Sequence, residues 1–312
     1  MPRTDRVPEA APARATLDDA AFQRTFGRIL AEPGLNERFI ASPREVGREL
    51  GLDDAQIAAL EATGLDKLRA FSHNLLSKRV GLLKKVCPAV YERAHQTKRL
   101  VPLASGFVRS HPPLESKEYS SRTTRDGFWF IDYLLSLDAE GSLDDPLLAE
   151  VARFERAMLS VSALEASLES SADFLESAAR VDALERDALL AARPRRGPHT
   201  VIETFGRDIV EVIRSLGEGR EPAETLEGPA PPGVERIVLF SKIAGWRNVR
   251  YAEINRQTRD LLELCDGMST TREIAARQLR QSHSTKDFDA YADSCLGLLR
   301  KLTQINVITF DR

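Results

Sequence analysis

The chain has 312 residues, of which 42% are hydrophobic and 29% are charged, as in ordinary globular proteins of about two domains. Forty-four Lys and Arg residues against 47 Asp and Glu residues give a formal net charge of -3. This balance disfavours a dedicated DNA-binding protein, because such proteins are held on nucleic acid by a strong positive field.

The cysteines and the hydropathy pattern bear on the compartment. Cys87, Cys265 and Cys295 are odd in number and widely spaced, so they predict neither a disulfide framework nor a paired-cysteine zinc site. The sequence has no apolar stretch of the length that a signal peptide or a membrane-spanning helix needs. We therefore expect a cytoplasmic protein.

The N-terminal part of the chain is expected to be helical. Residues 1–16 are rich in Ala, Pro and Arg without periodicity, which predicts a disordered tail. Over residues 17–192 apolar residues recur mostly at helical spacing, and Pro and Gly residues over 101–125 predict a loop. The longest helix is expected over residues 65–86, with an inner face formed by Leu68, Phe71, Leu75, Leu82 and Val86.

Charge is segregated within this helical part. Residues 67–99 hold nine Lys or Arg and one acid, whereas residues 132–190 hold fourteen acids and four Arg. Either the two segments attract each other inside one domain, or the basic segment docks on an acidic partner. The candidate docking residues are Arg69, His73, Lys78, Arg79, Lys84 and Lys85.

A domain boundary is expected at residues 193–198 (RPRRGP), where the composition changes from helix formers to strand formers. The elements expected beyond it are strands at 199–205, 235–242, 247–254 and 305–310 and helices at 208–216, 257–265, 271–280 and 286–302. This order indicates a winged helix-turn-helix domain over residues 197–312. The predicted fold class is therefore α+β, with a mostly helical domain over 17–192 followed by the winged helix domain.

Motifs for catalysis or metal binding are missing from the sequence. The five histidines are scattered, without HExxH or HxH spacing, and there is no GxSxG, P-loop or strand-associated GxGxxG. His73 is better explained as a solvated helix residue than as a ligand or base. Cys265 and Cys295 lie in apolar series and are better explained as core residues than as nucleophiles. We expect no metal site and no catalytic residue.

A winged helix domain has two common uses, and the charges separate them. The first half of the expected third helix carries Asp287, Asp289 and Asp293 against Lys286, which is the wrong sign for contact with phosphates. The alternative is a peptide that adds a strand to the free edge of the 247–254 strand. The candidate peptide-binding residues, chosen by strand alternation and helix spacing, are Arg247, Val249, Tyr251, Tyr291, Ser294 and Leu298.

The last 75 or so residues resemble a known family. The segment YAEINRQTRDLLELCDGMSTTREIAARQL, followed by LGLLRKLTQINVITF, is similar to PqqD-like recognition elements of ribosomally synthesised and post-translationally modified peptides (RiPPs). The resemblance is carried by Asn255, Leu261, Leu264, Cys265, Asp266, Gly267, Glu273, Ile274 and Leu279. It implies that the leader of a precursor peptide binds as an added strand between the last strand of the sheet and the third helix.

Residues 20–135 resemble a second family, the helical partner proteins of multinuclear non-haem iron-dependent oxidative enzymes (MNIOs). The resemblance is carried by FIASP at 39–43, LGL at 50–52 and the run LDKLRAFSHNLLSKRVGLLKKVCPAV, in which Lys78, Arg79 and Pro88 occupy the characteristic end. Both halves in one chain are similar to TglI-type partner proteins. The resemblance implies a non-catalytic subunit of a hetero-oligomer without a cofactor of its own, which presents a peptide core, commonly a cysteine, to the iron of the partner enzyme. It implies no binding to nucleic acid or membranes.

Two other functions stay open at this point. One is a transcriptional regulator whose helical half senses a ligand and whose winged helix binds DNA. The other is an enzyme that borrows a metal.

Overall fold

The computed structural model describes residues 19–112, 122–163, 168–227, 233–242, 249–282 and 287–311. The fold is α+β, mostly helical with small antiparallel sheets, and the expected tail at residues 1–16 lies outside the described residues. The chain forms two compact units. Unit 1 comprises residues 1–82 and 102–115, and unit 2 comprises 83–101 and 116–312. The boundary expected at 193–198 therefore lies inside unit 2.

Unit 1 is built from short helices around one apolar core. Its core side chains are Ile29, Phe39, Val46, Leu52, Ile57, Leu60 and Leu68. Asp53 begins one of the helices with a capping box, because its carboxylate accepts from the backbone N–H of Gln56 at 2.7 Å. The helices of this unit are α1 (Asp19–Ala31), α2 (Pro33–Ala41), α3 (Pro43–Glu49), α4 (Asp54–Thr63), the first part of α5 (Leu65–Val86), and α7 (Leu100–Ser110) from Pro102 onward.

The loop expected over residues 101–125 is wrong at both ends, which are helical, and residues 113–121 of it lie outside the described residues. Helix α7 covers its start, and α8 (Arg122–Ala139) covers its end. Pro102 lies in the first turn of α7, where the backbone N–H groups have no intrahelical partner, so the missing N–H of proline costs nothing there.

Helix α5 has the expected bounds, but it buries a different face. Leu68 is buried, whereas Phe71, Leu75 and Leu82 are 59%, 43% and 37% exposed. Arg79 is buried instead: its guanidinium donates to the His111 carbonyl oxygen at 2.6 Å and lies 4.7 Å from the centre of the Phe107 ring. The face against α7 is therefore partly polar, which a search for apolar residues does not find.

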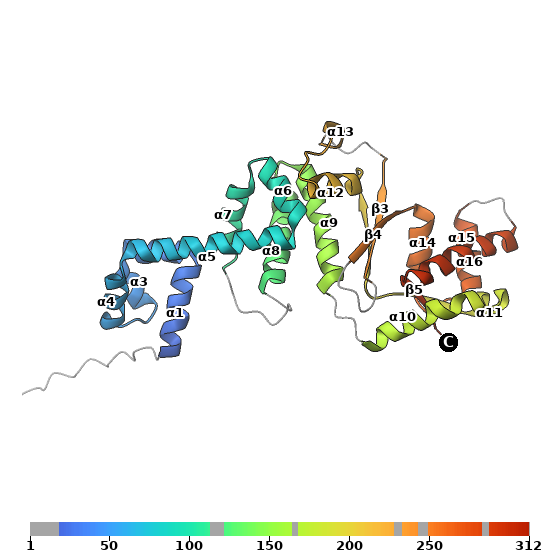
Figure 1. Cartoon of the computed structure of the whole chain (residues 1–312), viewed down its shortest axis with the longest axis horizontal. Helices are drawn as coiled ribbons and strands as arrows, with labels where there is room; N and C mark the ends of the chain where they lie inside the picture. The colour runs from blue at the N-terminus through green and yellow to red at the C-terminus, as the bar shows by residue number, and fades with distance from the viewer. Residues whose placement is uncertain are drawn as a thin grey trace, which may run out of the picture. The chain divides into compact units, whose positions relative to one another are not determined.

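Unit 2 has helix α9 (Pro146–Ala163) at its centre. Helices α6 (Pro88–Gln96), α8 and α12 (Ile209–Gly217) pack against α9, and so does one face of a three-stranded sheet. Asp145 caps the start of α9, because its carboxylate accepts from the backbone N–H of Leu148 at 3.0 Å. Figure 1 shows α9 on one side of the sheet and α14–α16 on the other.

The sheet has the strand order β2 (Thr200–Phe205), β3 (Arg236–Lys242), β4 (Val249–Ile254), and both pairings are antiparallel. Side chains alternate between its two faces. Phe240 packs on Phe154 of α9, with ring centres 4.9 Å apart. Leu239 faces the other way, into a core with Leu261 and Leu299.

The other face of the sheet is covered by the expected three helices. They are α14 (Arg256–Leu264), α15 (Thr271–Gln281) and α16 (Phe288–Gln304), followed by β5 (Ile308–Asp311). Further elements are α10 (Leu168–Arg180), the 3₁₀ turn η1 (Val181–Ala183), α11 (Arg186–Ala191) and α13 (Glu224–Glu227). Cys265 and Cys295 are buried in the two cores of this region, as expected.

The segment at residues 193–198, where a domain boundary was expected, begins with a strand that the sequence analysis did not predict. Its first residues form β1 (Arg193–Arg196), which pairs with β5 in antiparallel register, Pro194 opposite Phe310. A strand paired with the end of the chain cannot be recognised locally in an Arg- and Pro-rich tetrapeptide, because its partner lies more than a hundred residues away.

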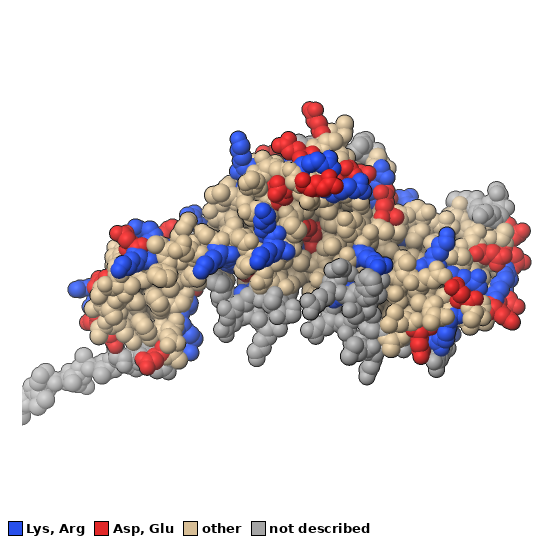
Figure 2. Space-filling view, viewed as in Figure 1, with Lys and Arg blue, Asp and Glu red and all other residues tan. Residues whose placement is uncertain are grey.

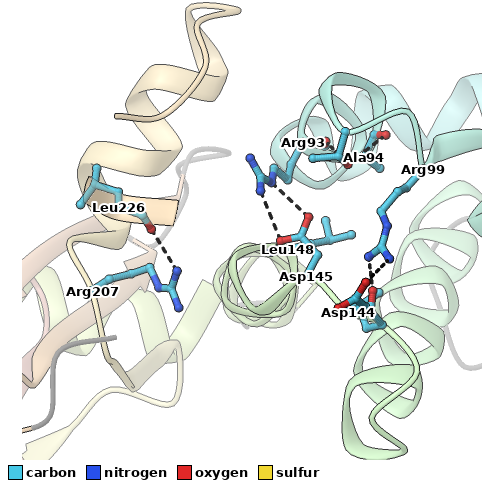
Figure 3. Close-up of polar contacts among 10 residues, drawn as sticks. Arg93, Ala94, Arg99, Asp144, Asp145, Leu148, Arg207 and Leu226 are labelled. Atoms are coloured by element: carbon cyan, nitrogen blue, oxygen red, sulfur yellow. Dashed lines mark hydrogen bonds and ion pairs between the residues drawn. The ribbon is translucent and has the colours of Figure 1, made fainter. Parts of the chain in front are cut away.

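Polar contacts join the basic and the acidic segments inside unit 2 (Figure 3). Arg93 pairs with Asp145 at 3.2 Å, and both side chains are buried. Arg99 pairs with Asp144 at 3.4 Å and donates to the carbonyl oxygen of Leu143. These pairs support the interpretation that the two segments attract each other within one compact unit.

We expect opposite effects from alanine at two helical glycines. A Cβ atom at Gly127 of α8 would lie 2.3 Å from Cγ1 of Val86, whereas one at Gly81 of α5 would have no neighbour within 4 Å. Gly81→Ala should raise the thermal unfolding midpoint, because alanine favours a helix by up to about 1 kcal/mol. Gly127→Ala should lower it, because overpacking costs about 1–3 kcal/mol. Scanning calorimetry checks both, and equal midpoints would contradict the close approach at Gly127.

Candidate functional site

Strand β4 is an exposed sheet edge. Among the described strands it pairs only with β3. The five interior residues of β3 are buried, whereas Arg250, Tyr251, Ala252 and Glu253 of β4 are exposed. An exposed edge of this kind offers unpaired backbone groups to another strand.

The hydrogen bonds of the sheet show which way the backbone of β4 points. The N–H of Lys242 donates to the carbonyl oxygen of His199 at 3.3 Å, so the backbone groups of Lys242 and Phe240 point to β2. Because directions alternate along an antiparallel strand, those of Ser241 and Leu239 point to β4.

The partners of Ser241 and Leu239 in β4 are Arg250 and Ala252, whose backbone groups therefore point inward, to β3. The N–H and C=O groups of Val249, Tyr251 and Glu253 then point to the free edge. The outward backbone groups belong to the residues that lie opposite Lys242, Phe240 and Val238, on the face of the sheet toward α9.

The side chain of Tyr251 is fixed against α9. Its ring meets that of Phe154 edge to face, with centres 5.0 Å apart, and lies 6.4 Å from the Phe240 ring. Tyr251 nevertheless keeps 38% of its surface exposed. It is an ordered aromatic side chain that still has area available for contact.

A cavity of about 950 Å³ lies beside this part of β4, entirely within unit 2. Val249 and Tyr251 form part of its wall. Its other walls come from the end of α5, from α6, α8, α9 and α12, and include Lys84, Lys85, Phe154, Glu155, Met158 and Leu216. The cavity therefore combines apolar surface with two lysines next to a free strand edge.

Glu155 lies in this wall and serves as the N-terminal cap of a neighbouring helix. Its two carboxylate oxygens accept from the backbone N–H groups of Ala89 and Val90 of α6, each at 2.9 Å. Burial raises the pKa of Glu155 to about 8, and the two backbone hydrogen bonds limit that rise. Burial of Cys87 and the nearby charge of Glu155 raise the pKa of the Cys87 thiol. This makes the thiol a weak nucleophile.

The structure does not bring the six candidate peptide-binding residues together in one groove. Val249 and Tyr251 face α9, whereas Leu298 packs on the core around Leu239, on the opposite face of the sheet. Tyr291 is buried, and its hydroxyl oxygen accepts from the side chain of Gln257 at 3.4 Å. Ser294 is exposed on α16, and Arg247 lies outside the described residues.

The candidate docking residues fall into three groups. Arg69, His73 and Lys78 are exposed on α5 in unit 1. Arg79 is buried against α7, so it is not available for docking. Lys84 and Lys85 belong to unit 2 and line the cavity beside β4. Figure 2 shows Lys and Arg side chains, with uncharged surface between them, along the course of α5.

The sequence analysis missed the contribution of α9 to this site. Phe154 and Met158 are apolar residues at helical spacing, a pattern typical of ordinary core residues, but both line the cavity. Glu155 carried a signal that could have been used, because it is an acid next to the apolar face of a helix. A buried acid at such a position needs hydrogen-bond donors, which here are the first N–H groups of α6.

Among the described residues, no group of three or more His, Cys, Asp or Glu side chains is placed to hold a metal ion. The helices in that part of the chain are too short or too polar to cross a membrane. Comparison of the sequence with protein-family models and with curated proteins found no match.

Proposed function

We propose that this chain is a non-catalytic peptide-binding subunit of a RiPP pathway. It binds the leader of a ribosomally made precursor peptide and presents the peptide core, a cysteine-containing segment, to a separate MNIO-type iron enzyme. Residues 197–312 serve as a PqqD-like winged helix domain under this proposal, and the iron belongs to the partner enzyme.

The free edge of β4 is the observation that carries the proposal. Three alternate residues, Val249, Tyr251 and Glu253, direct their backbone groups away from the sheet, and the strand is exposed. An extended peptide can pair with these groups irrespective of its sequence, and pockets beside the strand then select its side chains. The order of two strands, three helices and a last strand from β3 to β5 supports the winged helix interpretation.

The charges of α16 favour a peptide over DNA. Asp289 and Asp293 at its start are exposed, and Arg186 pairs with them at 2.8 and 2.6 Å. This arginine, which could have contacted a phosphate, is already engaged by two carboxylates. A recognition helix that begins with exposed acids repels the phosphate backbone.

The exposed face of α5 suits the second part of the proposal, docking on an enzyme. Phe71, Leu75, Lys78 and Leu82 are spaced by three or four residues, so they lie on one side of the helix. Interfaces with protein partners commonly combine such apolar anchors with charge at their rim. We propose this face of unit 1 as the enzyme contact, in place of the set that included Arg79.

Co-purification tests the proposal directly. The full chain is co-expressed with an MNIO-type enzyme and with a short cysteine-containing peptide encoded beside its own gene, and each pair is assayed by affinity capture. Fluorescence anisotropy with the labelled leader measures the peptide affinity. We expect the chain to bind both the leader and the enzyme.

A chain that binds neither molecule, or whose gene lies beside neither type of gene, contradicts the proposal. An electrophoretic shift with its own promoter fragment, weakening steeply with salt, would favour the transcriptional regulator instead. Stoichiometric iron or zinc in the isolated chain would favour an enzyme.

A further inference from the structure

We propose that the peptide paired with β4 carries one apolar and one acidic side chain two residues apart, and that both enter the cavity between β4 and α9. This inference rests on the proposed function and specifies, as a recognition rule, which peptide side chains the site selects. It places specificity on the α9 face of the sheet, away from α16.

The direction of the β4 backbone decides which peptide side chains reach the cavity. Residues directly opposite each other in paired strands project from the same face of a sheet. Peptide residues opposite Val249, Tyr251 and Glu253 therefore project toward α9, and they are two residues apart along the peptide. The cavity is lined by Val249 and Tyr251, so peptide side chains opposite these two residues are next to it.

The apolar part of the rule follows from the cavity wall. Phe154, Met158 and Leu216 line it together with the ring of Tyr251. Met158 is only partly buried, so it presents apolar area to the cavity. An apolar peptide side chain would cover this area, and removal of apolar surface from water favours binding.

The acidic part of the rule follows from the charges around the cavity. Lys84 and Lys85 line it, and both are exposed. The two acids of the wall have partners: Glu155 accepts from two backbone N–H groups, and Glu92 accepts from the side chain of Gln96 at 3.2 Å. Glu253, on the same face of β4, pairs with Arg236 at 2.8 Å. The lysines therefore attract a carboxylate rather than a cation.

A displayed library of random 12-residue peptides, selected on the full chain, tests the rule. We expect the enriched peptides to share an apolar residue and an Asp or Glu two positions apart. Enriched peptides without this pair would overturn the inference and leave the proposed function standing, whereas a selection that enriches no peptide would count against both.

Charge reversal then tests whether Lys84 and Lys85 bind the acidic side chain of the peptide. For a selected peptide, the double variant Lys84→Glu/Lys85→Glu should weaken binding by about tenfold or more, because attraction becomes repulsion. Changing the peptide acid to Lys should restore binding to this variant. The matched control is Lys67→Glu, an exposed lysine near the start of α5, which should bind like the unchanged chain. Equal loss in the control, or no rescue by the Lys peptide, contradicts recognition by Lys84 and Lys85.

Discussion

Replacing Tyr251 by proline is expected to abolish peptide binding while the chain stays folded. The N–H of Tyr251 points to the free edge of β4, so a bound strand would accept a hydrogen bond from it. Proline removes this donor, and its ring projects into the space of the added strand. The affinity should fall by about 100-fold or more, since a lost hydrogen bond and a steric block act together. Fluorescence anisotropy with a selected or leader peptide measures the loss.

The same substitution spares the fold because of the position of the residue. Proline is tolerated on an edge strand where the N–H faces solvent. Far-ultraviolet circular dichroism and the thermal midpoint establish that the variant is folded. Tyr251→Ala is the matched control: it keeps the N–H and loses the ring, with its contacts to Phe154 and Phe240, so binding should weaken but persist. A folded Tyr251→Pro variant with unchanged affinity would show that the peptide binds elsewhere.

The elements that were predicted well are those fixed by neighbouring residues. Asn255, Thr270 and Asp287 each cap a helix by accepting from a backbone N–H three residues on, and the three helices begin within two residues of the predicted starts. Alternation likewise located β2, β3 and β4 to within two residues. Capping and alternation are local signals, so a single sequence contains them.

The features that were missed depend on distant partners. Helix α5 carries Leu68 on one side and Phe71, Leu75 and Leu82 on another. The buried side is decided by distant helices, because Leu68 packs into the core with α1–α4 and Arg79 packs against α7. Strand β1 exists because β5 pairs with it. The α+β class could be predicted from the sequence, whereas the division into units 1 and 2 could not, because it falls within the uninterrupted helix α5.

The candidate site shows the same limit. The sequence predicted a free edge at β4, which is an edge among the described strands, and it predicted Tyr251 as a contact residue of a groove beside α16. It also assigned Lys84 and Lys85 to the enzyme contact, because they share a helix with Arg69 and Lys78. The structure places these two lysines next to β4. Under our proposals, the basic end of α5 contacts the peptide and the apolar face of α5 contacts the enzyme.

Removing the carboxylate of Glu155 is expected to destabilise unit 2. In Glu155→Ala the backbone N–H groups of Ala89 and Val90 lose their acceptors at a buried helix end, and each unsatisfied group costs about 1–3 kcal/mol. We expect the free energy of unfolding to fall by about 3 kcal/mol, measured by urea denaturation. Asp138→Ala, at an exposed carboxylate on α8, is the control and should change it by less than about 0.5 kcal/mol.

The raised pKa of Glu155 also predicts that the free energy of unfolding depends on pH, with a sign opposite to that of most acids. Its pKa rises from 4.5 to about 8 on folding, so the folded chain binds the proton more tightly than the unfolded chain. The proton on Glu155 contributes its full stabilisation below pH 4.5, and this contribution is lost as the pH rises through 8. The free energy of unfolding falls by up to about 5 kcal/mol over this range.

Glu155→Gln separates this titration from the loss of hydrogen bonds. The amide does not titrate, and it offers one acceptor oxygen for two N–H groups, so the variant should be less stable than the unchanged chain at pH 5. Between pH 5 and pH 9 the free energy of unfolding should fall more steeply for the unchanged chain than for Glu155→Gln. The difference in stability between the two proteins should therefore close or reverse. Urea denaturation across this range checks the expectation. Parallel pH profiles for the two proteins would show that the folded carboxyl group does not titrate there, and that its hydrogen bonds to α6 outweigh its burial.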